Sequence, residues 1–296
     1  MPMPMPMLNY VLTVTRLIAG DGTELAVHDF GGEGATLLLV HATGFHAHVL
    51  APMARELIGA FHCLGLDQRA HGDSGRPATG NLGWQAFGQD VLDVVDRLGF
   101  PHPLFGFGHS MGATSLLLAE ESAPGAFDAI YCFEPVMLPQ IGPLAPQHTN
   151  PLSAGALRRR EEFPSAEDAR ANFASKAPFD RFDPRVLDAY VEHGFAPTPE
   201  GTVRLKCRRS DEATIYAHGF AHDAFAGLGR VLCPVALACG GDTDSFGPDL
   251  LALDAARLSQ ATVTVLIGLG HFGPMEAPAA VAASVRAQLT GNARSV

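Results

Sequence analysis

The sequence predicts an α/β protein with a doubly wound, mostly parallel sheet. Short, continuously apolar runs, typical of strands buried on both faces, alternate with segments that have helical spacing. Polar clusters that contain glycine directly follow these runs, and functional residues in such sheets lie at the carboxyl ends of the strands. The chain has 296 residues, a length that suits one large domain carrying an insertion.

The first ten residues form a lead in which methionine alternates with proline, and we expect residues 1–10 to be disordered. The lead lacks the basic start and continuous apolar core of a secretory signal. Residues 11–17 and 24–30 follow, both rich in apolar and β-branched side chains. The turn signal Ala19-Gly20-Asp21-Gly22 separates them, so the sequence predicts an opening β-hairpin.

The predicted core covers residues 11–135 and 229–296 and alternates strands with helices. We expect further strands at residues 36–40, 61–66, 104–107, 128–133, 231–239 and 262–267, and helices at residues 48–58, 84–98, 113–120, 250–258 and 277–289. Because the two kinds of element alternate, these strands are expected to run parallel to one another.

The alternation of apolar strands and helices is interrupted between residues 136 and 228. Charged helical segments such as 158–162 and 166–172 appear there, and proline interrupts them repeatedly. We interpret this part as a helical cap inserted over the carboxyl edge of the sheet. Its aromatic residues are expected to form mainly the cap's own small core, with a few lining an apolar pocket.

The pentapeptide Gly108-His109-Ser110-Met111-Gly112 lies between a predicted strand and a predicted helix. A turn from strand to helix within one or two residues forces the middle residue into strained dihedral angles, and it brings the two backbones too close for side chains on either flank. Ser110 is therefore a candidate nucleophile. A serine hydroxyl needs a base to remove its proton, and His271, in the glycine-rich loop after the last predicted strand, is the candidate base.

Five motifs make the chain resemble the α/β-hydrolase family from about residue 24 to residue 290. They are GHSMG, a strand followed by HATG, the strand-end run DQRAHGDSG, a strand-end GDTD, and GLGHFGP late in the chain. The order nucleophile, acid, histidine is that of the family. The chain differs from the family's usual pattern at Ala42 and Ala70, where glycine is expected.

The resemblance implies a third member of a catalytic triad, an acid that orients His271. Asp244 ranks first, because the family's acid commonly stands three residues after a glycine, here Gly241. Glu134, at the end of the strand after the nucleophile's helix, ranks second. Asp242 ranks third. A solvated loop carboxylate or a helix cap is the alternative role for the acids that are not used.

The resemblance also implies an oxyanion hole made of two backbone N–H groups, those of Met111 and Thr43, with Phe45 and Ala42 as less favoured donors. Phe45, His109 and Arg158 are the candidate substrate-binding residues. Arg158 begins a run of three arginines that would clamp a substrate carboxylate, although such runs are usually solvated helix faces. His41, Arg69, His71 and Asp73 are expected to brace the strand-end loops.

These features predict a serine hydrolase that cleaves a carboxylic ester or thioester of a small, partly apolar acid. One alternative is hydrolysis of an enol-lactone, or of a carbon–carbon bond in a β-diketone that carries a carboxylate. A second alternative is a non-catalytic small-molecule receptor that has kept the hydrolase fold.

The composition limits the classes of molecule that the protein is expected to bind. The net charge of −11 argues against general binding to nucleic acid or anionic membranes, and no apolar run is long enough to span a membrane. Five cysteines without a C-x-x-C pattern indicate buried thiols and a reducing, cytoplasmic location. The pairs His46/His48 and His218/His222 lack accompanying ligands, so no metal or cofactor is expected. A homodimer is compatible with the sequence but has no signature in it.

Overall fold

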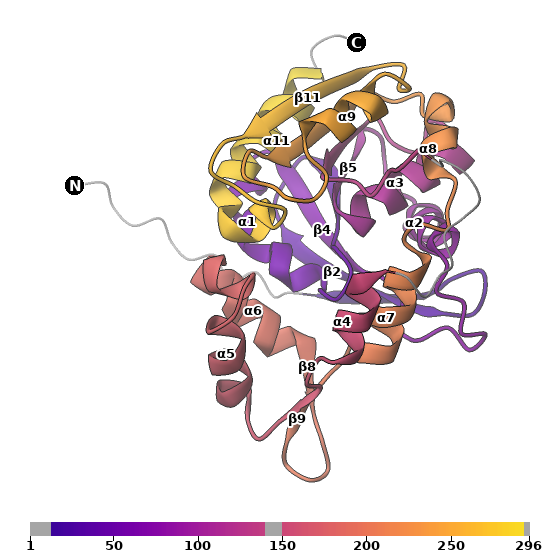
Figure 1. The fold of residues 1–296 in the computed structure, drawn as a ribbon. Helices are drawn as coiled ribbons and strands as arrows, with labels where there is room; N and C mark the ends of the chain where they lie inside the picture. The colour runs from indigo at the N-terminus through magenta and orange to yellow at the C-terminus, as the bar shows by residue number, and fades with distance from the viewer. Residues whose placement is uncertain (1–12, 140–149, 293–296) are drawn as a thin grey trace.

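The computed structural model of the protein describes residues 13–139 and 150–292 (Figure 1). Its centre is an eight-stranded sheet in the order β1-β2-β4-β3-β5-β6-β10-β11. The strands are β1 (Val14–Ile18), β2 (Glu24–Gly31), β3 (Ala35–Val40), β4 (Phe61–Asp67), β5 (Leu104–His109), β6 (Ala129–Phe133), β10 (Val235–Gly240) and β11 (Ala261–Leu266). The hairpin strands β1 and β2 are antiparallel, and the strands from β4 to β11 in this order are parallel.

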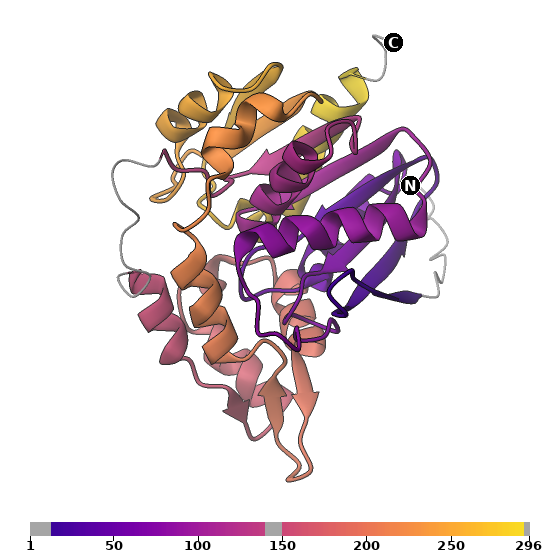
Figure 2. The same ribbon diagram turned by 90° about the vertical axis from the view of Figure 1, so that its right-hand side faces the viewer.

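Helices cover both faces of the sheet (Figures 1 and 2). On one face lie α2 (Trp84–Leu98), α3 (Met111–Ser122) and α9 (Pro248–Ala255), and on the other lie α1 (Ala51–Leu57) and α11 (Pro278–Asn292). Because successive strand residues point to opposite faces, Leu38 and Val40 of β3 pack into the first core while Leu37 and Leu39 pack into the second. The expected α/β fold with a doubly wound, mostly parallel sheet is confirmed.

The element boundaries follow the sequence prediction within a few residues. The largest shift is in β10, which begins at Val235 instead of residue 231. Residues Leu228–Arg230 form a 3-10 turn, and Pro234 precedes the strand. Because proline has no N–H for a β-ladder, this apolar run enters the sheet only after Pro234.

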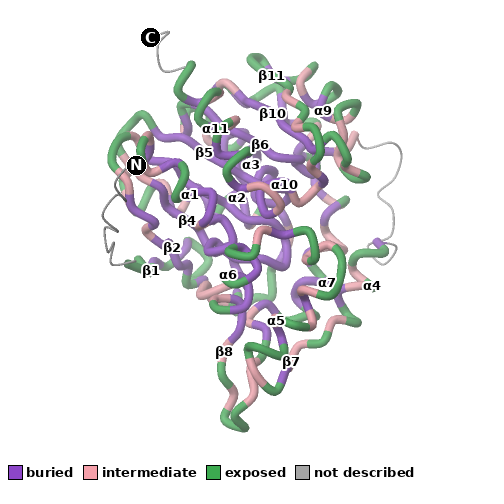
Figure 3. Tube along the Cα trace, turned by 90° about the vertical axis from the view of Figure 1, so that its left-hand side faces the viewer, coloured by how far each residue is buried: buried purple, intermediate pink, exposed green. Residues whose placement is uncertain are grey.

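The segment between β6 and β10 carries the inserted elements. Most of them project below the sheet (Figures 1, 2 and 3), while the last short helix lies beside α3. They are α4 (Pro151–Leu157), β7 (Glu162–Phe163), α5 (Ala166–Ala174), α6 (Pro184–Gly194), β8 (Phe195–Pro197), β9 (Val203–Leu205), α7 (Arg209–His218) and α8 (Ala224–Gly227). The expected helical segment at residues 166–172 is confirmed as α5, but the expectation of a helix at residues 158–162 is wrong. There α4 ends at Leu157, and Glu162 pairs with Arg204 in a β-ladder. The cap also contains a three-stranded antiparallel sheet in the order β7-β9-β8, which the sequence prediction lacks. Strands of two or three residues are too short to show a two-residue period.

Buried aromatic residues join this cap to the domain core. Phe173, Phe182 and Tyr190 belong to the same apolar cluster as Phe45 and α1. The expectation of a separate small cap core therefore needs correction, because the cap aromatics are continuous with the core on one face of the sheet. The positions 136 and 228 as domain limits stay a prediction. None of the described helices is long and apolar enough to cross a lipid bilayer.

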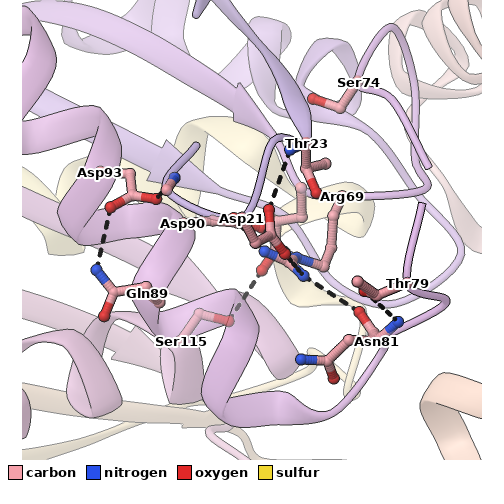
Figure 4. A network of polar contacts seen from close by, with 12 residues as sticks. Asp21, Thr23, Arg69, Ser74, Thr79, Asn81, Gln89, Asp90, Asp93 and Ser115 are labelled. Carbon is pink, nitrogen blue, oxygen red and sulfur yellow. Dashed lines mark hydrogen bonds and ion pairs between the residues drawn. The ribbon is translucent and has the colours of Figure 1, made fainter. Parts of the chain in front are cut away.

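A buried ion pair fixes the loop that follows β4 (Figure 4). The Arg69 guanidinium donates to both carboxylate oxygens of Asp90 on α2, each at 2.6 Å, and to Asp21 in the β1–β2 turn at 2.9 Å. Arg69 and Asp90 are almost fully buried, and breaking such a pair is strongly destabilising. Arg69 thus has the structural contacts expected of it, and it joins the loop after β4 to α2 and to the β1–β2 turn.

Asp254 on α9 is buried, and neither of its side-chain oxygens has a hydrogen-bond partner among the described residues. Removal from water raises the pKa of Asp254 to about 8. Because its folded-state pKa lies above that of the unfolded chain, the free energy of unfolding should fall as the pH rises toward the folded value.

We expect Asp254→Asn to remove this pH dependence, because an amide does not ionise. The free energy of unfolding of the variant minus that of the parent should therefore be about 4 kcal/mol larger at pH 9 than at pH 5, since one pKa unit corresponds to about 1.4 kcal/mol. Denaturant unfolding at the two pH values measures this. Asp249→Asn, in the exposed first turn of the same helix, is the control. A stability difference that does not change with pH would contradict the prediction.

Candidate active site

Ser110 occupies the sharp turn between β5 and α3, with φ 53° and ψ −117°. The flanking glycines are required by space. A Cβ on Gly108 would lie 2.3 Å from the Ala113 Cα, and a Cβ on Gly112 would lie 2.2 Å from the Val40 carbonyl oxygen. The Ser110 amide donates to the Phe133 carbonyl at 2.9 Å, so the strained residue is fixed to the neighbouring strand.

His271 lies in the loop between β11 and the short helix α10 (Gly273–Glu276). Its Nδ1 is 2.7 Å from Oε2 of Glu134, the first residue after β6. Nδ1 carries the proton in this contact, because a carboxylate oxygen accepts, and that leaves Nε2 as the basic nitrogen. The His271 carbonyl accepts from Nε2 of the buried His109 at 2.9 Å, which ties the histidine loop to the residue beside Ser110.

The Glu134 carboxylate is fully buried and accepts several hydrogen bonds. Besides His271, the amide of Gly240 donates to Oε1 at 3.0 Å, and Oε2 accepts from Thr243 Oγ1 at 2.9 Å and from the Phe246 amide at 3.3 Å. Buried charge is tolerated when its oxygens are paired in this way. Among the described residues, Ser110, Ala70 and Glu134 are the non-glycine residues with positive φ, and such strain commonly gathers at functional sites.

The acid ranked first from sequence needs correction. Asp244 is exposed and its Oδ1 accepts from its neighbour Ser245 at 3.2 Å, while the carboxylate on His271 is that of Glu134. The third-ranked Asp242 is also exposed. The end of β6 is next to β5, the strand that precedes Ser110, and the loop after β10 turns so that Thr243 instead of Asp244 contacts Glu134. The sequence signal was a glutamate directly after a fully apolar strand.

The loop after β3 is held beside α3 by two buried histidines. His41 donates from Nδ1 to the Ala42 carbonyl at 2.8 Å, and its Nε2 accepts from the Gln68 amide at 3.0 Å. His71 Nε2 accepts from the Gly44 amide at 3.0 Å. Burial lowers the pKa of His41 to about 4 and that of His71 to about 3, so both rings are neutral near pH 7, as acceptor nitrogens must be.

Thr43 and Met111, the two candidate oxyanion donors, are adjacent. The Thr43 hydroxyl donates to Met111 Sδ at 3.2 Å. Met111 is the first residue of α3, where backbone N–H groups have no intrahelical partner. No hydrogen bond between described residues uses the amide of Thr43 or of Met111. Of the two departures from the family pattern, Ala70 has φ 62°, the left-handed region that glycine adopts without strain, and Ala42 is buried.

A cavity of about 350 Å³ contains both Ser110 and His271 in its lining. Core and cap elements both contribute to its walls. The other lining residues are Ala42, Thr43, Trp84, Val136, Asn150, Leu152, Tyr216, Gly219, Phe220, Asp244, Ser245, Phe246 and Phe272. Most of these side chains are apolar or aromatic, as in small-molecule sites. Sequence reasoning missed the cap members Leu152, Tyr216 and Phe220, because no motif marks them.

The three substrate-binding candidates lie outside this lining. Phe45 is buried among aromatic rings, with the Tyr190 ring centroid 5.5 Å away, and His109 is fully buried. Arg158 is exposed, and its neighbour Arg159 forms a largely buried ion pair with Glu212. The arginine run therefore supplies an ion pair inside the cap instead of a carboxylate clamp in the cavity.

A second cluster brings His28, Asp67 and Asp73 together within metal-ligating distance. The Lys206 ammonium already lies 2.5 Å from Asp73 Oδ1, and Asp67 accepts from His28 Nε2 at 2.8 Å and from the amides of Ala47 and Asp73 at 2.7 Å. A lysine charge and filled carboxylate lone pairs leave no open cation position. These hydrogen bonds instead hold the loop after β4 in place.

Comparison with known proteins supports the fold and the family. The Alpha/beta hydrolase family model matches residues 37–284. The abhydrolase domain-containing protein AFT2-1 of Alternaria alternata is 28% identical over 211 residues, 60% of this chain and 79% of that protein.

The 2-(acetamidomethylene)succinate hydrolase of Mesorhizobium japonicum is 24% identical over 243 residues, 81% of this chain and 83% of that protein. A solved structure of E-2-(acetamidomethylene)succinate hydrolase superposes with a TM-score of 0.81 at 20% identity, covering 94% of this chain and 99% of that one. The family model covers well over half of the 296 residues and the fold agrees with it, so this chain belongs to the α/β-hydrolase family.

Proposed function

We propose that the protein is a serine hydrolase that cleaves a carboxylic ester or thioester of a small, partly apolar acid through an acyl-enzyme on Ser110. One observation carries the proposal: His271, held at 2.7 Å by the buried Glu134 carboxylate, lines the same cavity as the strained Ser110. A carboxylate on Nδ1 keeps Nε2 free to act as a base and stabilises the imidazolium that forms.

In this mechanism the Ser110 oxygen attacks the substrate carbonyl while His271 Nε2 takes the hydroxyl proton. The carbonyl oxygen becomes negative and accepts from the amides of Met111 and Thr43, each worth about 3–4 kcal/mol in the transition state. The C–O or C–S bond then breaks, and the leaving alcohol or thiol takes the proton from His271. A water molecule, deprotonated by His271, attacks the acyl-enzyme and releases the acid and Ser110.

The cavity supports a small acyl group. Its volume of about 350 Å³ is near the lower end of the range for ligand sites, roughly 300–1,000 Å³. Apolar side chains from Trp84, Val136, Leu152 and Phe246 contribute to its walls, and they favour a partly apolar acid.

A carboxylate-bearing substrate is the second candidate, because the 2-(acetamidomethylene)succinate hydrolase of Mesorhizobium japonicum aligns over 81% of this chain. Opening of an enol-lactone or cleavage of a carbon–carbon bond would use the same three side chains. A non-catalytic receptor would not react with a fluorophosphonate probe. Covalent labelling of Ser110 by such a probe therefore separates the enzyme from the receptor.

We expect Ser110→Ala to lower kcat for p-nitrophenyl butyrate by at least about four orders of magnitude, because triad members act as a unit. Glu134→Gln should lower kcat by roughly three to four orders, since it removes the charge that stabilises the imidazolium. Steady-state kinetics measure both variants, with thermal unfolding to show that they fold. Asp242→Asn is the control. A loss for Asp244→Asn as large as that for Glu134→Gln would contradict the assignment of the acid.

The proposed oxyanion donors are backbone groups, which a side-chain substitution does not remove. The role of the loop after β3 is therefore tested with a substitution that changes its conformation. Gly44 has φ +80°, and a Cβ there would lie 2.6 Å from Glu212 Oε1 and 3.3 Å from Arg159 Nη1. Gly44→Ala should displace the Thr43 amide and lower kcat by about tenfold to a hundredfold, with a smaller effect on KM.

The matched control is Gly80→Ala. Gly80 has φ +72° and nothing within 4 Å of the added carbon, so this variant carries a similar backbone strain without the contact. Kinetics and thermal unfolding of both variants are compared. If Gly44→Ala keeps the parent kcat, or Gly80→Ala loses as much, the loop does not supply the donor.

A further inference from the structure

We propose that Asp244 sets the charge preference of the cavity, so that the enzyme favours substrates with a cationic group near the reacting carbonyl and disfavours carboxylates. This inference rests on the proposed hydrolase function and names a substrate class for the same site. It assigns Asp244 to specificity, a role different from the triad acid for which the sequence suggested it.

The first support is the charge of the cavity walls. Asp244 is the only carboxylate among the described lining residues, and none of those residues is a lysine or an arginine. Residues 140–149, which the structure does not describe, contain no lysine or arginine in the sequence either. His271, the one imidazole in the described lining, is occupied with Glu134 and with the reaction. A substrate carboxylate would therefore meet a negative charge and no fixed positive partner.

The second support is that the Asp244 charge is not neutralised. Among the ion pairs between described residues none involves Asp244, and its side chain accepts a hydrogen bond from the Ser245 hydroxyl at 3.2 Å. The side chain is exposed, and an exposed aspartate is negative at neutral pH. Asp242, on the same loop, lies outside the cavity lining. A cation bound in the cavity would have a negative neighbour in a partly enclosed site, where Coulomb attraction exceeds that in bulk water.

The third support is the position of the arginines that the sequence suggested as a carboxylate clamp. Arg159 donates to Glu212 and to the Tyr190 hydroxyl. Arg160 donates to the Glu162 carbonyl at 2.7 Å and lies over the Phe163 ring, and Arg158 is exposed outside the lining. Moving a carboxylate from water into a site without a partner is costly.

The proposed oxyanion hole is the one part of the described site that favours an anion. The amides of Met111 and Thr43, at the N-terminus of α3, would bind a negative oxygen. During turnover this position takes the reacting carbonyl oxygen. An anionic substrate that puts its carboxylate there would hold its ester away from Ser110, and it would act as an inhibitor instead of a substrate.

The test compares three esters with one leaving group and one spacer. They are p-nitrophenyl γ-(trimethylammonio)butyrate, its isostere with a tert-butyl group in place of the ammonium group, and the p-nitrophenyl monoester of glutarate. A second set places the cationic, neutral or anionic group on the leaving thiol. It consists of butyrylthiocholine and its counterparts with a tert-butyl group or a carboxylate in place of the ammonium group. kcat/KM is measured for the parent, Asp244→Asn and the control Asp242→Asn, which removes a charge from the same loop outside the cavity lining.

We expect the parent to prefer the cation over the anion by at least about tenfold in one of the two sets, and Asp244→Asn to reduce that ratio by about tenfold. Asp242→Asn should leave the ratio within about twofold of the parent. High salt should shrink the preference of the parent, because salt screens charges at an open site.

The outcomes separate this inference from the function on which it rests. If the neutral esters are not hydrolysed and Ser110 is not labelled by a fluorophosphonate, the proposed function fails. If the neutral esters are hydrolysed but the anion is turned over as well as the cation in both sets, the charge preference is overturned. If Asp242→Asn changes the ratio as much as Asp244→Asn does, the assignment to Asp244 is overturned.

Discussion

The hydrogen bond between Glu134 and His271 is the interaction on which the site depends. It joins the end of β6 to the loop after β11, two segments separated by 137 residues along the chain. Because Nδ1 of His271 is held by a carboxylate, the ring has one tautomer and one orientation. The same carboxylate accepts from Gly240 and Thr243, so it also fixes the end of β10. One buried charge thus aligns three strand ends around the serine.

The cap is connected to this arrangement through its contact with the loop after β3. Arg159 and Glu212 come from the cap, and their ion pair packs against the Cα of Gly44, where even a methyl group would not fit. On the other side, His71 accepts from the Gly44 amide. The loop that carries the Thr43 amide is therefore held between a cap ion pair and a core histidine. A change in cap position would therefore displace the Thr43 amide, and in the proposed mechanism this would change the geometry of the oxyanion hole.

The sequence predicted the fold and the strained turn at Ser110 because both have local causes. The elbow needs glycine on each side of Ser110, and buried parallel strands need continuous apolar runs. The acid was ranked wrongly for a non-local reason. Asp244 and Glu134 both follow strands of the sheet, and which carboxylate reaches His271 depends on how the β10 loop turns after Gly240. The cavity walls from α4 and α7 depend on packing between cap and core, which no local pattern encodes.

Because the carboxylate that contacts His271 comes from the end of β6, the loop after β10 does not have to supply it. When a carboxylate from that loop orients the histidine, its charge is buried and paired, and the loop is constrained by the chemistry. Here Glu134 fills that position, and Thr243 Oγ1 provides the link from the loop to the acid at 2.9 Å. Asp244 is then left with a solvated charge in the wall of the substrate cavity. The same loop position can therefore serve substrate selection, because the reaction no longer fixes what its side chain must contact.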